Sequence, residues 1–372
     1  MKPDLLIVGG GPGGGLSALL AARRGMRVQL IERKRFPRDK VCGEVFSSTA
    51  REVLQRAELL EPLFERGALP LDGCSFGDQR GRGFVGALNG LSLSRAAFDL
   101  FLKERAIEAG VDWIEGRSAG QPILDGGRVV AIEVRAEGGH SAARFTAERF
   151  VAADGRRSRL AHHLKLPGGD PQRTRPASRF GLKCHLVGVE GLPRGRVAMH
   201  LFPGGYAGLS EIEEGRWNLC MQIDAATLKA QRDPERILDK ILRCHLALGK
   251  QLRNAKRCSR WHSIGPLRYG SRAAFAAGVY FVGDAAGTID PFCGLGIGRA
   301  LRSAELAVQS LVQDDAGRRY RQAWEHELGR QALRNRRFGA LIERPAIGNW
   351  AIGAIGARFP QLGQRCLQAS WR

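Results

Sequence analysis

The apolar positions at the start of the chain predict a β–α–β unit. Asp4–Val8 is apolar at every position after the first, which is typical of a buried parallel strand. Leucines then recur at helical spacing within 16–20, and Val28–Ile31 is a second strand that ends on Glu32. Strand, helix and strand thus follow one another within about thirty residues, the length of one such unit.

Later segments continue this pattern of buried strands and apolar-faced helices. The further strands are predicted at Val111–Glu115, Arg149–Ala153 and Gly278–Val282. One helix is predicted to run from the N-cap Ser94 to Gly110, and another follows the glycines at 294–298.

Residues 179–223 instead show the alternation of an antiparallel sheet. Four strands are predicted there, at Arg179–Val187, Arg196–Phe202, Tyr206–Ser210 and Arg216–Ile223. In the last strand, Trp217, Leu219, Met221 and Ile223 share one face, and we expect such apolar groups to line a substrate pocket. A helix is predicted from Asp233-Pro234 to about Gly249.

These elements predict an α/β fold in which a Rossmann-like domain is interleaved with an antiparallel-sheet substrate domain, plus a helical C-terminal region. The first domain is discontinuous and takes residues 1–72, 95–178 and 262–317, whereas the second takes 73–94 and 179–261. Residues 318–372 mix arginine-rich helical stretches with apolar patches that include Trp350 and Phe359. We expect them to form a helical cap over the substrate domain, with a surface anchor on anionic lipid as the alternative.

Composition excludes several classes of protein. The 372 residues carry 58 Lys+Arg against 37 Asp+Glu, a formal charge of +21. However, 48 of the basic residues are arginines spread along the chain, without a zinc finger, an RNP signature or a basic heptad region, so we expect no nucleic-acid partner. No apolar run approaches the ~20 residues of a membrane span, and we expect no signal peptide.

The eight cysteines are scattered, with no CxxC pair and no Cys/His cluster at metal-ligand spacing. We therefore expect reduced thiols, no metal site and a cytoplasmic protein. Peripheral contact with the inner face of the membrane is left open.

The glycines that follow the first strand carry the first chemical signal. Gly9 can make a tight turn, Gly11 can let the backbone approach a pyrophosphate, and Gly14 can let the helix pack closely on the strand. The N-terminus of that helix offers unpaired N–H groups to phosphates. Glu32 is placed to accept from ribose hydroxyls, which favours FAD or NAD over NADP. The predicted contacts of this segment are Gly9, Gly11, Pro12, Gly13, Gly14, Glu32 and Arg33.

Two acidic turns favour FAD over NAD. One strand runs into Asp154-Gly155 and another into Gly283-Asp284, where an acid beside small residues can hold a ribityl chain. Gly294 and Gly296 then open a helix whose positive end would favour an anionic reduced flavin by ~0.3–2 kcal/mol.

These motifs resemble those of the flavoprotein hydroxylase superfamily, whose best-known fold is that of p-hydroxybenzoate hydroxylase. Within it, Phe36–Glu44 (FPRDKVCGE) and Asp290–Ile297 (DPFCGLGI) are most similar to the geranylgeranyl reductase branch. The resemblance covers about residues 4–312. It implies that FAD contacts fall on Gly14, Glu32, Cys42, Gly43, Arg95, Ala119, Asp284, Gly296 and Ile297.

The resemblance is weaker on the substrate side. Reductases of that branch carry Tyr-x-Trp-x-Phe-Pro, whereas this chain has Tyr206-Ala207-Gly208-Leu209-Ser210. It also lacks the WxWxIP motif of flavin-dependent halogenases. The substrate is therefore left open between a lipid-like and a polyketide-like molecule.

We expect an FAD-dependent oxidoreductase that reduces C=C bonds of such an apolar substrate, with NAD(P)H or a ferredoxin-type protein as the electron donor. The alternatives are an FAD-dependent monooxygenase of an aromatic or polyketide substrate and an FAD-binding interaction module. The candidate catalytic residues are Cys42, Tyr206 and Cys293. Cys42, Tyr206 or His200 could protonate the substrate, and Cys42 and Cys293 could pair in a redox role.

Overall fold

A six-stranded sheet forms the centre of the first domain in the computed structural model, which describes residues 2–137, 139, 141–166 and 179–335. Its strands are parallel except for β18, which is antiparallel to β19. In spatial order they are β18 (Phe275–Ala276), β19 (Val279–Phe281), β10 (Arg149–Ala152), β1 (Leu5–Val8), β2 (Val28–Glu32) and β6 (Asp112–Glu115). The central strands are fully buried, as their unbroken apolar sequence predicts.

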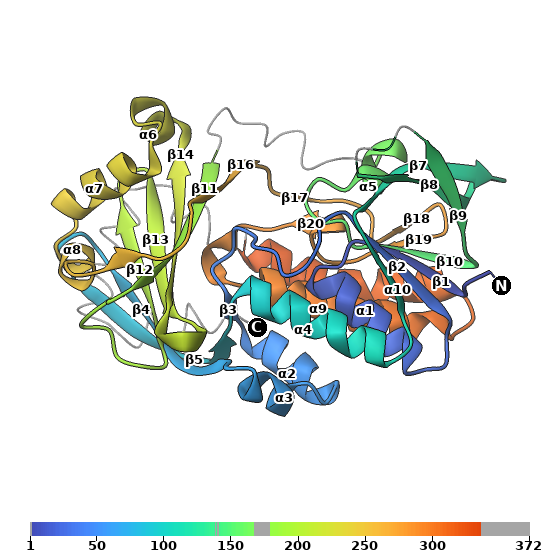
Figure 1. Ribbon diagram of the computed structural model, residues 1–372, viewed down its shortest axis with the longest axis horizontal. Coiled ribbons are helices and arrows are strands. Elements are labelled where there is room, and N and C mark those ends of the chain that lie inside the picture. Colours follow the sequence, from blue (N-terminus) through green and yellow to red (C-terminus); the bar gives the residue numbers. More distant parts are fainter. Residues whose placement is uncertain (1, 138, 140, 167–178, 336–372) are drawn as a thin grey trace.

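Helices cover one face of this sheet, and a small three-stranded sheet covers the other (Figure 1). The helices are α1 (Pro12–Ala22), α4 (Arg95–Glu108) and α9 (Gly296–Leu311), with α2 (Ser48–Arg56) and α3 (Leu60–Glu65) beside them. The small sheet comprises β7 (Arg117–Asp125), β8 (Arg128–Ala136) and β9 (Ala142–Thr146). As predicted, the hydroxyl of Ser94 caps α4 by accepting from the N–H of Ala97 at 3.1 Å.

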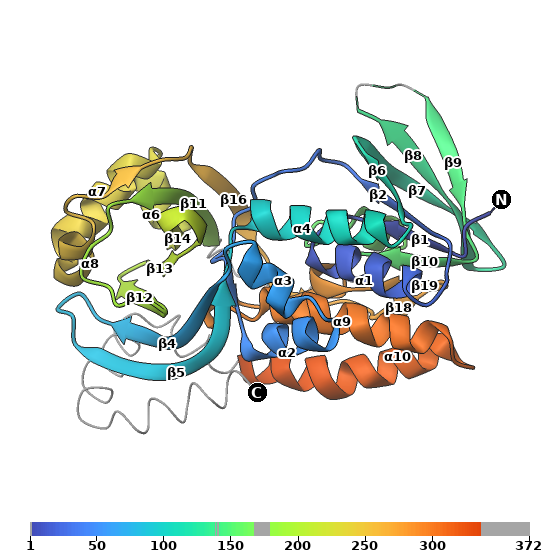
Figure 2. The same cartoon turned by 60° about the horizontal axis from the view of Figure 1, so that its bottom comes forward.

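The second domain is a nine-stranded, strongly curled sheet (Figure 2). Its pairings are antiparallel except for the parallel pair of β4 and β12. Along the sheet the strands are β15 (Lys256–Arg257), β11 (Arg179–Val187), β14 (Trp217–Asp224), β13 (Gly205–Glu211), β12 (Arg196–Phe202), β4 (Leu69–Gly77), β5 (Gly83–Ser92) and β3 (Val45–Phe46), while β16 (His262–Leu267) pairs with β11. Thus β3, the start of β4 and β16 come from segments that the sequence pattern assigns to the first domain.

The sheet buries apolar groups on both faces, and one prediction is corrected here. The residues expected to line the pocket, such as Leu219 and Met221, instead pack against helices α7 (Pro234–Cys244) and α8 (Leu246–Gln251). The opposite face of β14, which carries Asn218 and Gln222, is the one turned toward the first domain. The alternation of side chains between the two faces of β14 is correctly predicted, but this pattern does not determine which face packs against the helices.

The predicted helix at 233–249 is interrupted at His245. The Nδ1 atom of His245 accepts from the N–H of Leu248 at 3.2 Å and so caps a second helix. The remaining α-helices and strands of the described residues are short: α5 (Arg159–His163), α6 (Ala225–Ala230), β17 (Gly270–Ser271) and β20 (Gly287–Thr288).

The described part of the C-terminal region packs on the first domain, contrary to the expected cap over the substrate domain. Helix α10 (Ala316–Trp324) lies against α9, and the hydroxyl of Tyr320 donates to the carbonyl of Phe281 in β19 at 2.6 Å. Trp350, Phe359 and the rest of 336–372 lie outside the described residues. Within the described ranges, no helix is long and apolar enough to cross a membrane.

Candidate flavin site

Two glycines of the first turn are required by packing. Gly9 has a φ of +101°, which a side chain rarely adopts, and a Cβ there would overlap the carbonyl of Ala153. A Cβ at Gly14 would overlap the carbonyl oxygen of Gly9. Gly13 packs close to Val282 and to the carbonyl of Ala300, so it lets α1 approach α9. These residues shape the turn that begins α1.

Gly11, by contrast, faces open space beside two arginines. A Cβ built there would meet nothing nearer than the Nη2 atoms of Arg95 and Arg38, at 3.7 and 3.9 Å. Gly11 is also the N-cap residue of α1, so the unpaired N–H groups of the helix lie next to it. Helix terminus and guanidinium groups together favour an anion at this position.

The two arginines share one buried carboxylate. Arg95 donates from Nε and Nη2 to Asp99 at 2.9 and 2.6 Å, and Nη1 of Arg38 lies 2.9 Å from Asp99 Oδ2. Although burial lowers the pKa of Arg95, Asp99 raises it above the ordinary value, so the guanidinium stays charged. Two positive charges against one negative charge leave a net positive charge beside Gly11.

Lys40 adds a further basic group nearby. Its Nζ atom would lie 3.7 Å from a Cβ at Gly155, on the turn after β10. Burial, and to a lesser extent the charge of Arg95, lower the pKa of Lys40. A bound anion would offset both effects. Taken together, the open glycine and this donor set fit the pyrophosphate of FAD.

Glu32 is fixed at the end of β2, as the sequence predicts. Its Oε2 accepts from the N–H of Gly10 at 2.7 Å and its Oε1 from that of Lys34 at 2.8 Å. Each oxygen keeps a second lone pair that can accept from a ribose hydroxyl. Arg33 beside it is exposed.

The other predicted contacts of the dinucleotide lie on three separate segments. Asp154 accepts from the N–H of Arg159 at 2.7 Å, and burial raises its pKa. Asp284 lies in the 3₁₀ turn Gly283–Ala285, near the charges of Lys40 and Arg299. Ala119 is buried on β7. Because Asp154 accepts from the N–H of Arg159, it also stabilises its own loop, a role that is not evident from the sequence.

The glycines before α9 divide into open and packed positions. Gly294 has a φ of +65°, and a Cβ at Gly296 would meet no atom within 4 Å. A Cβ at Gly298, by contrast, would overlap Ser47 in front of α2. The backbone around Gly296 is thus accessible to a flat ring, and the buried Ile297 follows in the first turn of α9.

The turn at Cys42 and Gly43 lies between the two domains. The carbonyl of Cys42 accepts from Asn218 Nδ2 at 3.0 Å, and that of Gly43 accepts from Ser210 Oγ at 3.2 Å. The Cys42 thiol accepts from the N–H of Glu44 at 3.4 Å, and the Glu44 carboxylate accepts from the N–H of Arg95 at 2.7 Å. A Cβ at Gly43 would meet no atom within 4 Å. This turn is therefore linked both to the start of α4, where Arg95 lies, and to the second sheet.

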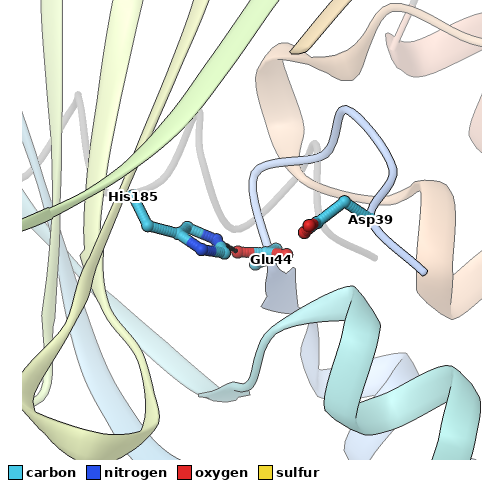
Figure 3. A group of neighbouring side chains, drawn as sticks. All are labelled: Asp39, Glu44 and His185. Atoms are coloured by element: carbon cyan, nitrogen blue, oxygen red, sulfur yellow. Dashed lines mark hydrogen bonds and ion pairs between the residues drawn. The ribbon is translucent and has the colours of Figure 1, made fainter. Parts of the chain in front are cut away.

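Three residues at this junction are missing from the predicted set: Glu44, Lys183 and His185. Glu44 Oε1 lies 2.6 Å from Lys183 Nζ. Figure 3 shows the other contact, in which Glu44 Oε2 lies 2.7 Å from His185 Nε2. Although burial lowers the pKa of Lys183, Glu44 raises it above the ordinary value. A signal was present in the sequence, since Lys183 and His185 alternate with apolar residues in β11.

The predicted catalytic residues do not all come together. Tyr206 and Cys293 are buried in one apolar cluster, and the Tyr206 hydroxyl donates to Gln222 Oε1 at 3.2 Å. Burial raises the pKa of Tyr206 well above its usual value. The Cys42 sulfur accepts from the N–H of Glu44 at 3.4 Å, whereas Cys293 has Cys74 as an electrostatic neighbour.

His200 is a poor candidate for proton donation to the substrate. It alternates along β12 with Met199 and Leu201, which belong to the cluster of Tyr206, so it lies on the opposite face of the sheet. Its ring is 4.8 Å from that of His245, and burial lowers the pKa of His200 to about 3. It is therefore neutral near pH 7.

We name the apolar set around Tyr206 the loop-facing cluster. It joins strands β4, β5 and β12 to the loop that precedes α9, and the ring of Phe292 in that loop lies 5.0 Å from the Tyr206 ring. The cluster consists of Leu71, Cys74, Phe76, Leu88, Val197, Met199, Leu201, Tyr206, Phe292, Cys293 and Leu295.

Comparison with known proteins agrees with this geometry. A family model described as "FAD binding domain" matches residues 2–322. Digeranylgeranylglycerophospholipid reductase 2 of Methanopyrus kandleri is 29% identical over 343 residues, covering 89% of this chain and 84% of the relative. Digeranylgeranylglycerophospholipid reductase 1 of that organism is also 29% identical, covering 88% of this chain and 87% of the relative.

Solved structures show the same fold. The flavin-dependent brominase Bmp2 superimposes with a TM-score of 0.84 at 19% identity, covering 100% of this chain and 94% of its own. A geranylgeranyl bacteriochlorophyll reductase-like protein from Thermoplasma acidophilum gives 0.78 at 21% identity, covering 99% of both chains. The expected fold and cofactor are confirmed: the chain belongs to the FAD binding domain family and is an FAD-dependent oxidoreductase that resembles its geranylgeranyl reductase branch.

Proposed function

We propose that the protein is a reductase that saturates C=C bonds of an apolar, lipid-like substrate. The observation that carries this proposal is the loop-facing cluster, which places buried apolar groups of the second sheet against the loop before α9. Apolar side chains at such a position suit a hydrocarbon chain and leave few groups that could bind a polar substrate. The names of the relatives from Methanopyrus kandleri support the same substrate class.

The chain's residues divide between holding the cofactor and serving the substrate. Gly11, Arg38 and Arg95 would hold the pyrophosphate, Glu32 the adenosine ribose and Asp284 the ribityl chain. The backbone at Gly43 and Gly296 would lie against the flavin ring. Bound FAD, once reduced, supplies the hydride that C=C reduction needs. The electrons would come from an external NAD(P)H or ferredoxin-type donor.

A proton must reach the second carbon of the double bond, and Cys42 is the better placed donor. Its thiol lies in the turn between the two domains, next to Gly43, where a Cβ would meet no atom within 4 Å. Tyr206, in contrast, has a raised pKa and donates to Gln222, so loss of its proton is costly. Tyr206 would serve as a wall of the substrate site.

The test is anaerobic incubation of the reduced holoenzyme with a digeranylgeranylglycerol phospholipid, followed by mass spectrometry. A product that gains two hydrogen atoms per double bond supports the reductase. A product that gains oxygen only in air would instead favour a monooxygenase. A bound flavin that neither NAD(P)H nor a reduced ferredoxin reduces would favour an interaction module.

A further inference from the structure

Glu44 lies at the centre of a buried charged cluster that the proposed mechanism does not use. Glu44 and Lys183 are fully buried, and His185 is nearly so. Asp39 extends the cluster toward the surface, with its Oδ1 atom 3.3 Å from Lys183 Nζ. Burying charges costs desolvation energy that ion pairing only partly offsets, so a cluster of this kind points to a role beyond stability.

The cluster does not have the character of a metal site. One ligand atom each from Asp39, Glu44 and His185 lie within 4.8 Å of one another, which is compatible with a cation (Figure 3). The ammonium group of Lys183 already serves as that cation, since it contacts both carboxylates. The two carboxylates therefore already have a positively charged partner within the protein, and a metal ion is not needed to balance them.

The backbone of Glu44 also has an uncommon conformation. Its φ is +57°, in the left-handed region that residues other than glycine rarely adopt. Besides Lys183 and His185, its carboxylate accepts from the N–H of Arg95 at the start of α4, at 2.7 Å. One side chain therefore fixes the end of the Cys42–Gly43 turn to both domains.

That turn borders each part of the flavin site. On one side the Glu44 carboxylate binds the N–H of Arg95, whose guanidinium adjoins Gly11. On the other side, Val45 lies 3.9 Å from a Cβ built at Gly294, before α9. A Cβ at Gly43 or at Gly296 would meet no atom within 4 Å, so the backbone is accessible both in this turn and at the start of α9.

We propose that Glu44 is a positioning residue that, with Lys183 and His185, holds the Cys42–Gly43 turn at the flavin end of the cofactor and ties it to the substrate-side sheet. These three residues control the environment of the flavin ring, whereas other residues hold the pyrophosphate. This inference depends on FAD binding alone and is independent of the substrate.

The test compares Glu44→Gln with Glu213→Gln as a matched control. Glu213 is also buried, accepts from the N–H of Ser94 at 2.9 Å at the same end of α4, and pairs with Arg216 at 2.7 Å. The measurements are the FAD dissociation constant, the fluorescence of the bound flavin and the rate of its anaerobic reduction by dithionite.

In Glu44→Gln we expect FAD to remain bound, its fluorescence to rise and its reduction rate to change by about tenfold, as for outer contacts that orient a reactive group. Glu213→Gln should match the wild type in fluorescence and rate. Wild-type fluorescence and rate in Glu44→Gln, or equal changes in both variants, would overturn the proposal. If Glu44→Gln does not fold, His185→Gln is measured in the same way. This substitution alters the contact between residue 185 and Glu44, while the ion pair of Glu44 with Lys183 remains.

Discussion

Asp99 accepts two hydrogen bonds from the guanidinium of Arg95, at 2.9 and 2.6 Å, and Arg38 binds the same carboxylate at 2.9 Å. The pair Arg95–Asp99 spans one turn of α4 and is buried, so the guanidinium has a fixed orientation. Its Nη2 atom lies beside Gly11, 3.7 Å from the position of a Cβ built there. A single carboxylate thus orients two guanidinium groups and balances only one of their two positive charges.

Arg95→Met should weaken FAD binding while leaving the protein folded, because Asp99 keeps Arg38 as a partner. The loss of a charge-assisted hydrogen bond of about 1.5–3 kcal/mol corresponds to roughly a 10–100-fold higher dissociation constant. Titration of apoprotein with FAD, followed by flavin fluorescence, measures it. Arg27→Met, which breaks the exposed pair with Asp4, is the control. An unchanged dissociation constant in Arg95→Met would remove Arg95 from the cofactor site.

Gly11→Ala and Gly14→Ala should separate ligand contact from packing. A methyl group at Gly11 meets no protein atom closer than 3.7 Å, and the φ of −74° accepts alanine. We therefore expect an unchanged melting temperature of the apoprotein but weaker FAD binding. A methyl group at Gly14 overlaps Gly9, so that variant should lose stability before any ligand is added. Full FAD affinity in a folded Gly11→Ala protein would contradict this role of Gly11.

The sequence predicts well what depends on local pattern and less well what depends on contact between distant segments. Strands such as Arg179–Val187 are correct to the residue, because their alternation is set by the two faces of a sheet. The side of β14 that meets α7 could not be predicted, because both faces bury side chains. The role of Glu44 cannot be recognised from local pattern, because its partners Lys183 and His185 lie more than a hundred residues away in the sequence.

Tyr320→Phe tests the corrected position of α10. The Tyr320 hydroxyl donates to the carbonyl of Phe281 at 2.6 Å in a fully buried environment. Removing it leaves a buried carbonyl without this donor, which costs about 1–3 kcal/mol. We expect the free energy of unfolding, measured with urea, to fall by this amount, and FAD binding to persist. If stability is unchanged, α10 does not dock on β19 as the structure shows.

His200 should make the protein sensitive to acid. Burial lowers the pKa of His200 from 6.5 to about 3, so below pH 6.5 the unfolded chain binds a proton that the folded protein does not. Stability is therefore lost progressively as the pH falls from 6.5 toward 3. At about pH 4.5 the loss from this one group amounts to roughly 2–3 kcal/mol.

His200→Leu removes the group from both states and should flatten that part of the pH dependence. The ring lies among buried residues between β12 and α8, so leucine is compatible with the site. Urea unfolding at about pH 7 and about pH 4.5 gives the free energies of unfolding, and the difference between the two should shrink by roughly 2–3 kcal/mol in the variant. The same substitution at the exposed His162 is the matched control. A variant that loses as much stability in acid as the wild type would show that His200 takes up a proton in the folded protein, and hence that its ring is accessible to water.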